Sequence, residues 1–110
     1  MRVLTWDLDN PVVTGTHKRR YVLNGRYEPV ELRINAGTVS DDANLVVDVN
    51  DDGNSIFDVA PALSKNDNLK RHRTFANARP MEDGSVITLD IDQGADGIDG
   101  VTVELELAEV

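Results

Sequence analysis

The sequence predicts an all-β protein, a single domain folded as an antiparallel two-sheet β-sandwich with a jelly-roll-like arrangement. Apolar and polar residues alternate with a period of two in several separate segments, as in strands that bury one face. Turn residues divide these segments at short, regular intervals, and no segment of useful length has the helical period. A chain of 110 residues suits one sandwich core of six to eight strands. One sheet closed into a barrel is the alternative.

Residues 1–16 are expected to form either an edge strand or an arm that reaches a neighbouring subunit. Residues 3–8 alternate loosely between apolar and polar side chains, which is typical of a strand at the edge of a sheet. Pro11 then interrupts the pattern, because proline has no N–H to donate to a strand ladder. The sequence leaves both alternatives open, and the sandwich domain is expected to span residues 17–110.

Residues 17–34 predict two strands joined by a hairpin. Tyr21 and Leu23 share one face of the first strand, and Asn24-Gly25 is a typical hairpin turn. In the second strand, the apolar residues Val30, Leu32 and Ile34 alternate with Glu31 and Arg33.

Residues 44–59 predict the clearest hairpin of the chain. The residues expected on the buried face of its first strand are Leu45, Val47 and Val49. Residues 51–54 supply the reversing turn, because Gly53 tolerates the positive φ that such a turn needs. The apolar run resumes at Ile56 and Phe57 after the turn.

Residues 60–85 are the least regular part, since proline, asparagine and an Asp-Gly pair break any long element. Leu63, Leu69 and Phe75 are expected to anchor this excursion to the core. Within it, residues 64–79 carry a local charge of +4, which leaves −13 on the rest of a chain whose formal net charge is −9. The basic residues of this stretch are Lys65, Lys70, Arg71, Arg73 and Arg79.

Residues 86–107 predict two further strands. Ile87, Leu89 and Ile91 alternate with polar residues, and the same period resumes after the Gly- and Asp-rich loop 94–100. The residues expected to face the core from the last strand are Val101, Val103, Leu105 and Leu107. The carboxylates between them keep the other face hydrated and discourage pairing with further strands.

Composition excludes several classes of function. The chain has 20 acidic and 11 basic residues, a balance that disfavours nucleic-acid binding because phosphate contacts need a basic surface. The absence of cysteine excludes disulfides and thiol chemistry. No apolar run is long enough for a signal peptide or a membrane span, so we expect a soluble protein made in a cytoplasm, with no membrane partner.

The ordered segments LVVDVNDDGNSIF, DGSVITLDIDQ and GIDGVTVELEL resemble a small β-sandwich module of tailed-bacteriophage virion proteins. In that module, a strand ending in Val-Asp-Val or Val-Asp-Ile enters a turn and returns through an Asn-Gly-x-Ser/Thr-Ile-Phe type segment. A Gly-Asp-x-Ile-x-Val-Asp-Ile strand and a closing Gly-x-x-Leu-x-Val-x-Leu strand follow. The resemblance covers residues 17–107, and it departs from the pattern where Asp83-Gly84 and Ser85 replace the Gly-Asp pair.

The resemblance implies a structural virion protein without catalytic residues, and therefore not an enzyme. We expect a capsid decoration (cement) protein, made in the host cytoplasm, that binds the major capsid protein on the outer head surface and stabilises capsomer contacts. It is expected to assemble as a homotrimer or another small homo-oligomer. The alternative is a receptor- or glycan-binding module of a tail fibre or baseplate.

Two features are candidates for the interface. The basic stretch would dock on an acidic surface of the capsid or of a neighbouring copy, where opposite charges set orientation and association rate. Trp6 is the single tryptophan, and we expect it in the core or at an interface. Together with Tyr21 and Tyr27 it would otherwise form a platform for stacking sugars.

Two acidic motifs raise the question of calcium. Residues 48–53 match the first half of an EF-hand loop, but Val59 stands where a bidentate glutamate is needed, so we interpret them as a hairpin turn. Around residues 90–99, a hard cation would relieve repulsion among carboxylates. The candidate ligands there are Asp92, Asp96 and Asp99. A solvated turn is the preferred interpretation, and no cofactor is expected.

The sequence offers no pattern for catalysis. His17 and His72 are the only histidines, and both lie among lysine and arginine residues, where a surface role is expected. Ser55 and Ser85 have no histidine nearby in the sequence, and no Gly-x-Ser-x-Gly motif is present.

Overall fold

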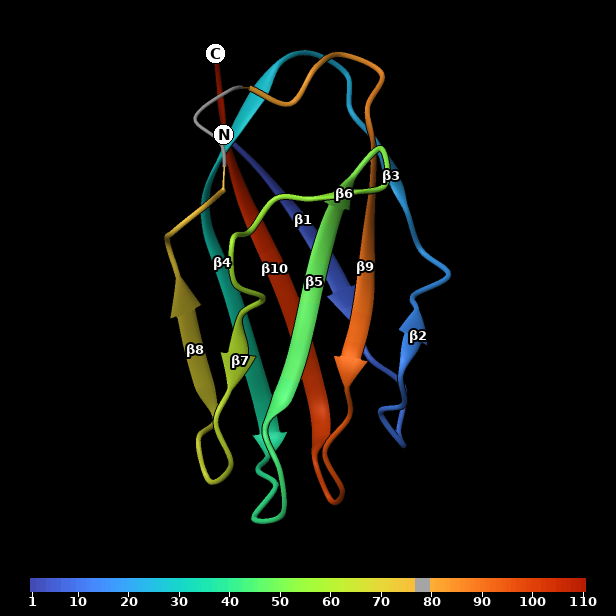
Figure 1. Cartoon of the computed structure of the whole chain (residues 1–110), viewed down its shortest axis with the longest axis vertical. Coiled ribbons are helices and arrows are strands. Elements are labelled where there is room, and N and C mark those ends of the chain that lie inside the picture. The colour runs from blue at the N-terminus through green and yellow to red at the C-terminus, as the bar shows by residue number, and fades with distance from the viewer. Residues whose placement is uncertain (77–79) are drawn as a thin grey trace.

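The computed structural model describes residues 1–76 and 80–110, which form ten strands and no helix, arranged as two antiparallel sheets packed face to face (Figure 1). The order in sheet A is β1 (Arg2–Asp7), β10 (Asp99–Glu109), β4 (Tyr27–Thr38) and β8 (Leu69–His72). Sheet B is built on β9 (Val86–Gln93) and β5 (Leu45–Asp51). Its short strands are β2 (Gly15–Thr16) and β3 (Tyr21–Val22) beside β9, and β6 (Asn54–Ser55) and β7 (Ala62–Leu63) beside β5.

This strand order is that of a jelly roll. When β2 with β3, and β6 with β7, are each counted as one interrupted strand, eight strands remain, and the chain passes from sheet to sheet as in two Greek keys. The predicted all-β sandwich is therefore confirmed. The barrel alternative is wrong, because the strands divide into two separate hydrogen-bonded sheets.

The core lies between the two sheets and is filled by alternating side chains of the long strands. Ten residues predicted to face inward from β5, β9 and β10 are buried, each with at most 7% of its surface exposed. They are Leu45, Val47, Val49, Ile87, Leu89, Ile91, Val101, Val103, Leu105 and Leu107. Complete burial of one such side chain stabilises the fold by about 1.5–3 kcal/mol. The alternation of these three strands thus accounts for the centre of the sandwich.

The predicted hairpin at Asn24-Gly25 is wrong, because the chain changes sheets there. β3 pairs with β9 in sheet B, whereas β4 pairs with β10 and β8 in sheet A. Residues on both sides of the turn hydrogen-bond to the segment that precedes β9: the Leu23 N–H donates to Ser85 O, and the Tyr27 N–H donates to Met81 O. The positive φ of Gly25 serves a crossover between sheets, and not a hairpin.

A β-bulge in β4 breaks the predicted alternation at Val30, which is 39% exposed. β10 pairs Glu106 with Glu31 but Leu107 with Pro29, so Val30 is left without a register partner. Such an extra residue locally disrupts the ladder and bends the strand. Beyond the bulge, the predicted alternation holds, with Leu32 and Ile34 in the core.

The excursion between β6 and β9 is anchored by two of the three predicted residues. Leu63 is buried, and Phe75 packs against the core and stacks on Phe57 with ring centroids 5.4 Å apart. Leu69 is 43% exposed, so its predicted anchoring role is wrong. It pairs with Asn35, whose side chain is on the outward face of sheet A, and the register therefore turns Leu69 outward as well.

Candidate protein-binding site

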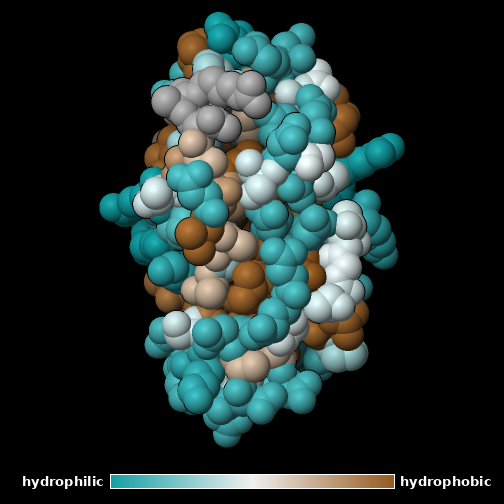
Figure 2. Space-filling view, in the orientation of Figure 1, coloured by the Kyte–Doolittle hydropathy of each residue, from teal (hydrophilic) through white to brown (hydrophobic). Residues whose placement is uncertain are grey.

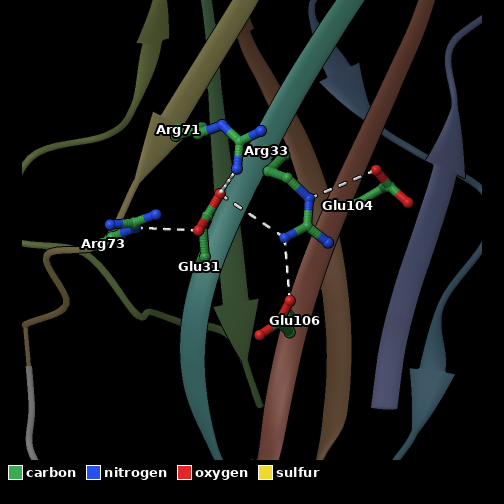
Figure 3. A network of polar contacts seen from close by, with 6 residues as sticks. All are labelled: Glu31, Arg33, Arg71, Arg73, Glu104 and Glu106. Atoms are coloured by element: carbon green, nitrogen blue, oxygen red, sulfur yellow. Dashed lines mark hydrogen bonds and ion pairs between the residues drawn. The ribbon is translucent and has the colours of Figure 1, made fainter. Parts of the chain in front are cut away.

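The outward face of sheet A carries a network of acidic and basic side chains from β4, β10 and β8 and from the residue that follows β8 (Figure 3). The antiparallel ladders bring them together, because Arg33 of β4 is the register partner of both Glu104 of β10 and Arg71 of β8. Its members are Glu31, Arg33, Arg71, Arg73, Glu104 and Glu106. We call this set the arginine–glutamate network.

Glu31 is the centre of the arginine–glutamate network, and only 8% of its side chain is exposed. Its Oε1 accepts a hydrogen bond from Arg71 Nη1 at 3.3 Å, and its Oε2 accepts one from Arg73 Nε at 3.0 Å. Arg33 Nη1 lies 3.7 Å from Oε1. Burial alone would raise the pKa of Glu31, but the Arg73 hydrogen bond and the charges of Arg73, Arg71 and Arg33 outweigh it and lower this pKa. The carboxylate is therefore held ionised.

The three arginines differ in how much of their hydrogen-bonding capacity remains. Arg33 is largely covered and is shared among Glu31, Glu104 and Glu106; its hydrogen bond to Glu106 is the main cause that raises its pKa. Arg71 and Arg73 are 56% and 69% exposed, and each contacts one carboxylate oxygen of Glu31. A guanidinium has five N–H donors, so both retain donors for the carboxylate of a partner.

Residues 64–76, the described part of the basic stretch, lie along one lateral edge of the sandwich, but the side chains point in different directions. Arg71 and Arg73 are on the outward face of sheet A, whereas Lys70 pairs with the core residue Ile34 and lies on the opposite side of β8. Lys65 is exposed in the loop before β8. Arg79 lies outside the described residues. The predicted docking surface is thus divided between two faces of one strand.

The prediction that Trp6 is available at an interface is corrected by its position, since none of its surface is exposed. Its Nε1–H donates to Arg19 O at 2.9 Å, and its ring meets that of Tyr21 edge to face at 5.3 Å. The Tyr21 hydroxyl in turn donates to Thr5 O at 2.6 Å. Trp6 is therefore a core residue, and the three aromatic residues do not form a sugar-stacking platform.

The three candidate calcium ligands do not converge. Among residues 1–76 and 80–110, no group of three or more histidine and carboxylate side chains is placed to hold a metal ion. Asp99 Oδ1 instead accepts the N–H of Gly100 at 2.7 Å, in the tight turn at the start of β10. Asp96 lies in the loop, and Asp92 is at the end of β9. The described contacts do not bring these three aspartates together, and calcium binding by them stays an untested prediction.

Asp92 belongs to a row of carboxylates on the outward face of sheet B. Partial burial is the first cause that raises its pKa, and the charges of Asp48 and Asp90 raise it further. The other two carboxylates have neutral hydrogen-bond donors: Ser55 Oγ donates to Asp48 at 2.6 Å, and Asn50 Nδ2 donates to Asp90 at 2.7 Å. This face is mostly hydrophilic, with small hydrophobic patches near its middle (Figure 2).

Asp92→Asn is expected to stabilise the fold at pH 7. Because folding raises the pKa of Asp92 above its ordinary 3.8, the ionised form opposes folding, and this cost is absent below the unfolded pKa. Urea unfolding should show the variant to be more stable than the wild type at pH 7 and nearly equal to it at pH 3. Asp96→Asn, in the loop, is the matched control. A stability difference for Asp92→Asn that persists undiminished at pH 3 would contradict this account.

Both histidines are engaged with backbone groups. His17 Nδ1 accepts the N–H of Arg19 at 3.0 Å, and His17 Nε2 donates to Asp7 O at 2.8 Å. His72 Nε2 donates to Thr74 O at 2.9 Å, and its ring packs edge to face against Phe57. These contacts give both residues structural roles at the two lateral edges of the sandwich.

Sequence reasoning missed Glu31 as a member of the site. Alternation placed it on the outward face of its strand, but arginines 40 and 42 positions further along the chain bury it there. The excess of basic residues in 64–79 was the available signal. It could not identify Glu31, because the sequence does not show which strand pairs with β8.

Comparison with known proteins adds no relative, since no protein-family model, curated protein or solved structure matches this chain. In the part of the chain that the structure describes, no helix has the length and apolar character needed to cross a membrane.

Proposed function

We propose that this chain is a structural protein of a tailed-bacteriophage virion, a capsid decoration protein that binds the major capsid protein on the outer head surface. The observation that carries the proposal is the exposure of Arg71 and Arg73 at the β8 edge of sheet A. Each guanidinium is oriented by Glu31 and has donors to spare, which suits docking on acidic side chains.

The virion setting rests on the resemblance of three ordered segments, from LVVDVNDDGNSIF to GIDGVTVELEL. The jelly-roll fold is compatible with it, since this fold recurs in viral capsid and lectin domains, although fold alone does not determine function. A net charge of −9 keeps free copies apart in solution, and the basic edge then offers an attractive approach to an acidic partner. On the particle, the protein acts by binding, with no chemical step, and assembles as a homotrimer or another small homo-oligomer.

The double substitution Arg71→Glu, Arg73→Glu is expected to weaken binding to particles stripped of this protein by at least about tenfold, because two attractive contacts become repulsive. Co-sedimentation of the labelled protein with the particles measures its occupancy. The matched control is Lys18→Glu, Arg20→Glu, which reverses two exposed charges at the opposite lateral edge, between β2 and β3.

Circular dichroism must show that both variants fold, since the new glutamates lie near Glu31. Wild-type occupancy is also expected to fall as salt is raised from 50 mM to 500 mM, because screening shortens the range of the attraction. Equal occupancy for the wild type and the Arg71, Arg73 variant would refute docking through this edge.

The alternative, a receptor- or glycan-binding module of a tail fibre or baseplate, makes a different prediction about copy number. A head decoration protein follows the many symmetry-related sites of the capsid and should be present in hundreds of copies per particle, whereas a tail component is present in tens or fewer. Quantitative mass spectrometry of purified particles separates the two. A low copy number together with binding on a glycan array would favour the alternative.

A further inference from the structure

The two lateral edges of sheet A differ in how their backbone groups are satisfied. At the β1 edge, the Thr5 N–H donates to the Tyr21 hydroxyl at 3.1 Å, and the same hydroxyl donates to Thr5 O at 2.6 Å. Two residues further along β1, Asp7 O accepts a hydrogen bond from His17 Nε2 at 2.8 Å. The side chains of His17, just after β2, and of Tyr21, in β3, thus occupy the positions that an added strand would need, and this edge is closed.

The opposite edge of sheet A is β8, which pairs with β4 on one side (Figure 1). Backbone groups alternate between the two sides of an antiparallel strand. Because Asn68 O accepts the N–H of Ala36, the backbone groups of Lys70 and His72 face β4, and those of Leu69 and Arg71 face outward. In residues 1–76 and 80–110, no side chain hydrogen-bonds to the outward groups of Leu69 and Arg71. Among the residues that the structure describes, the β8 edge is therefore open and the β1 edge is closed.

The side chains of β8 determine which strand would fit. Two β8 edges from two copies of the chain would place Lys70 and Arg71 near their own counterparts, and like charges on adjacent strands are destabilising. An extended acidic segment would instead place alternate carboxylates beside Arg71 and Arg73, on the face shown in Figure 3. Leu69, 43% exposed on the same face, offers an apolar contact at the other end of the strand.

We propose that the outer edge of β8 is a strand-addition site, which takes an extended acidic segment of a partner protein as a further strand of sheet A. Main-chain hydrogen bonds to Leu69 and Arg71 would supply affinity, and the arginines would select an acidic sequence. The inference rests on the proposed function only for the identity of the partner. The openness and charge of the edge belong to this chain alone.

Hydrogen exchange followed by NMR tests the site directly. The probe is an eight-residue peptide of alternating glutamate and valine with blocked ends, and the matched control peptide replaces each glutamate with lysine. The glutamate peptide should slow exchange of the outward amides of Leu69 and Arg71, while those of Lys70 and His72 are already protected by β4. The lysine peptide should have no effect. Failure of the glutamate peptide to bind, or binding without protection of Leu69 and Arg71, would overturn the proposal.

A pair of substitutions at Leu69 separates strand addition from simple charge attraction. Leu69→Pro removes an outward N–H and leaves every charge in place, a change that edge strands tolerate on their outer side. Leu69→Ala also loses the leucine side chain but keeps the N–H. Peptide affinity should fall about tenfold more for Leu69→Pro than for Leu69→Ala. The proline variant loses one hydrogen bond and leaves the peptide carbonyl that would accept it without a donor. Equal affinities for two folded variants would overturn strand addition.

The same variants distinguish failure of this inference from failure of the proposed function. Particle occupancy that is lost with Arg71→Glu, Arg73→Glu but unchanged with Leu69→Pro would remove strand addition and leave the decoration role intact. Peptide binding with amide protection, but no binding to particles, would remove the decoration role and leave the strand-addition site intact.

Discussion

Trp6→Ala is expected to lower the free energy of unfolding by about 3–5 kcal/mol, the range for large aromatic residues truncated in a core. Trp6 is fully buried on the inner face of β1, an edge strand that also carries Leu4 into the core. The substitution would leave a large cavity beside Tyr21, and it would remove the donor to Arg19 O. Because Tyr21 also covers the outer backbone groups of Thr5, the loss should spread to the β1 edge.

Urea unfolding at pH 7 measures this loss. Trp6→Phe is the matched control, because it keeps an aromatic ring in the core but loses the Nε1–H hydrogen bond, and it should cost clearly less than Trp6→Ala. Particle binding per folded molecule should be the same for Trp6→Phe and the wild type. A Trp6→Ala protein as stable as the wild type but defective in binding would restore Trp6 to the interface and contradict its placement in the core.

Local patterns were sufficient to predict the strands that form the centre of the fold. In β5, β9 and β10, each apolar residue at an odd-numbered position is buried. These strands are paired on both sides, so their alternation is regular and all of these side chains point to the core. Gly53 was likewise interpreted correctly, since the turn it forms joins β5 to β6 within two residues. Where the partner strand lies close in sequence, or where alternation is strict, sequence alone determines the local structure.

The errors arose where the local pattern depends on a distant partner. Asn24-Gly25 has the composition of a hairpin turn, but the segment before β9 takes the hydrogen bonds of both flanks. Val30 alternates correctly with Leu32, yet the shift opposite Glu106 and Leu107 turns it outward. Leu69 is apolar, yet the register with Asn35 exposes it. None of these registers is encoded in the residues concerned.

The candidate site shows the same division. An excess of positive charge in residues 64–79 is visible in the sequence, and it led to Arg71 and Arg73. Their partner Glu31 is in β4, before the β5–β6 hairpin in the sequence. Only the pairing of β8 with β4 brings the three residues together. A charged stretch therefore identifies the basic side of an interaction site, while the residue that orients it emerges only from the sheet register.

Glu31→Gln is expected to cause the largest loss of stability of any single charge substitution on the outward face of sheet A, with a fall in Tm of several degrees. The carboxylate is shared by three arginines, and a neutral amide at this buried position would leave their mutual repulsion uncompensated. The glutamine NH₂ group would also face a guanidinium, placing donor against donor. Glu104→Gln is the matched control, because Glu104 is 38% exposed and, among the described residues, forms one ion pair, with Arg33 at 3.7 Å.

The loss should depend on pH in a direction fixed by the lowered pKa of Glu31. A carboxyl group whose pKa is lower in the folded than in the unfolded state stabilises the fold above the unfolded value, here 4.5, and this stabilisation disappears as the pH falls through the folded value. The difference between wild type and Glu31→Gln should therefore be constant from pH 7 to pH 5 and should shrink towards pH 2. Thermal unfolding across this range measures it. A difference that stays the same at pH 2 would mean that packing, and not the charge shared among the arginines, is what Glu31 contributes.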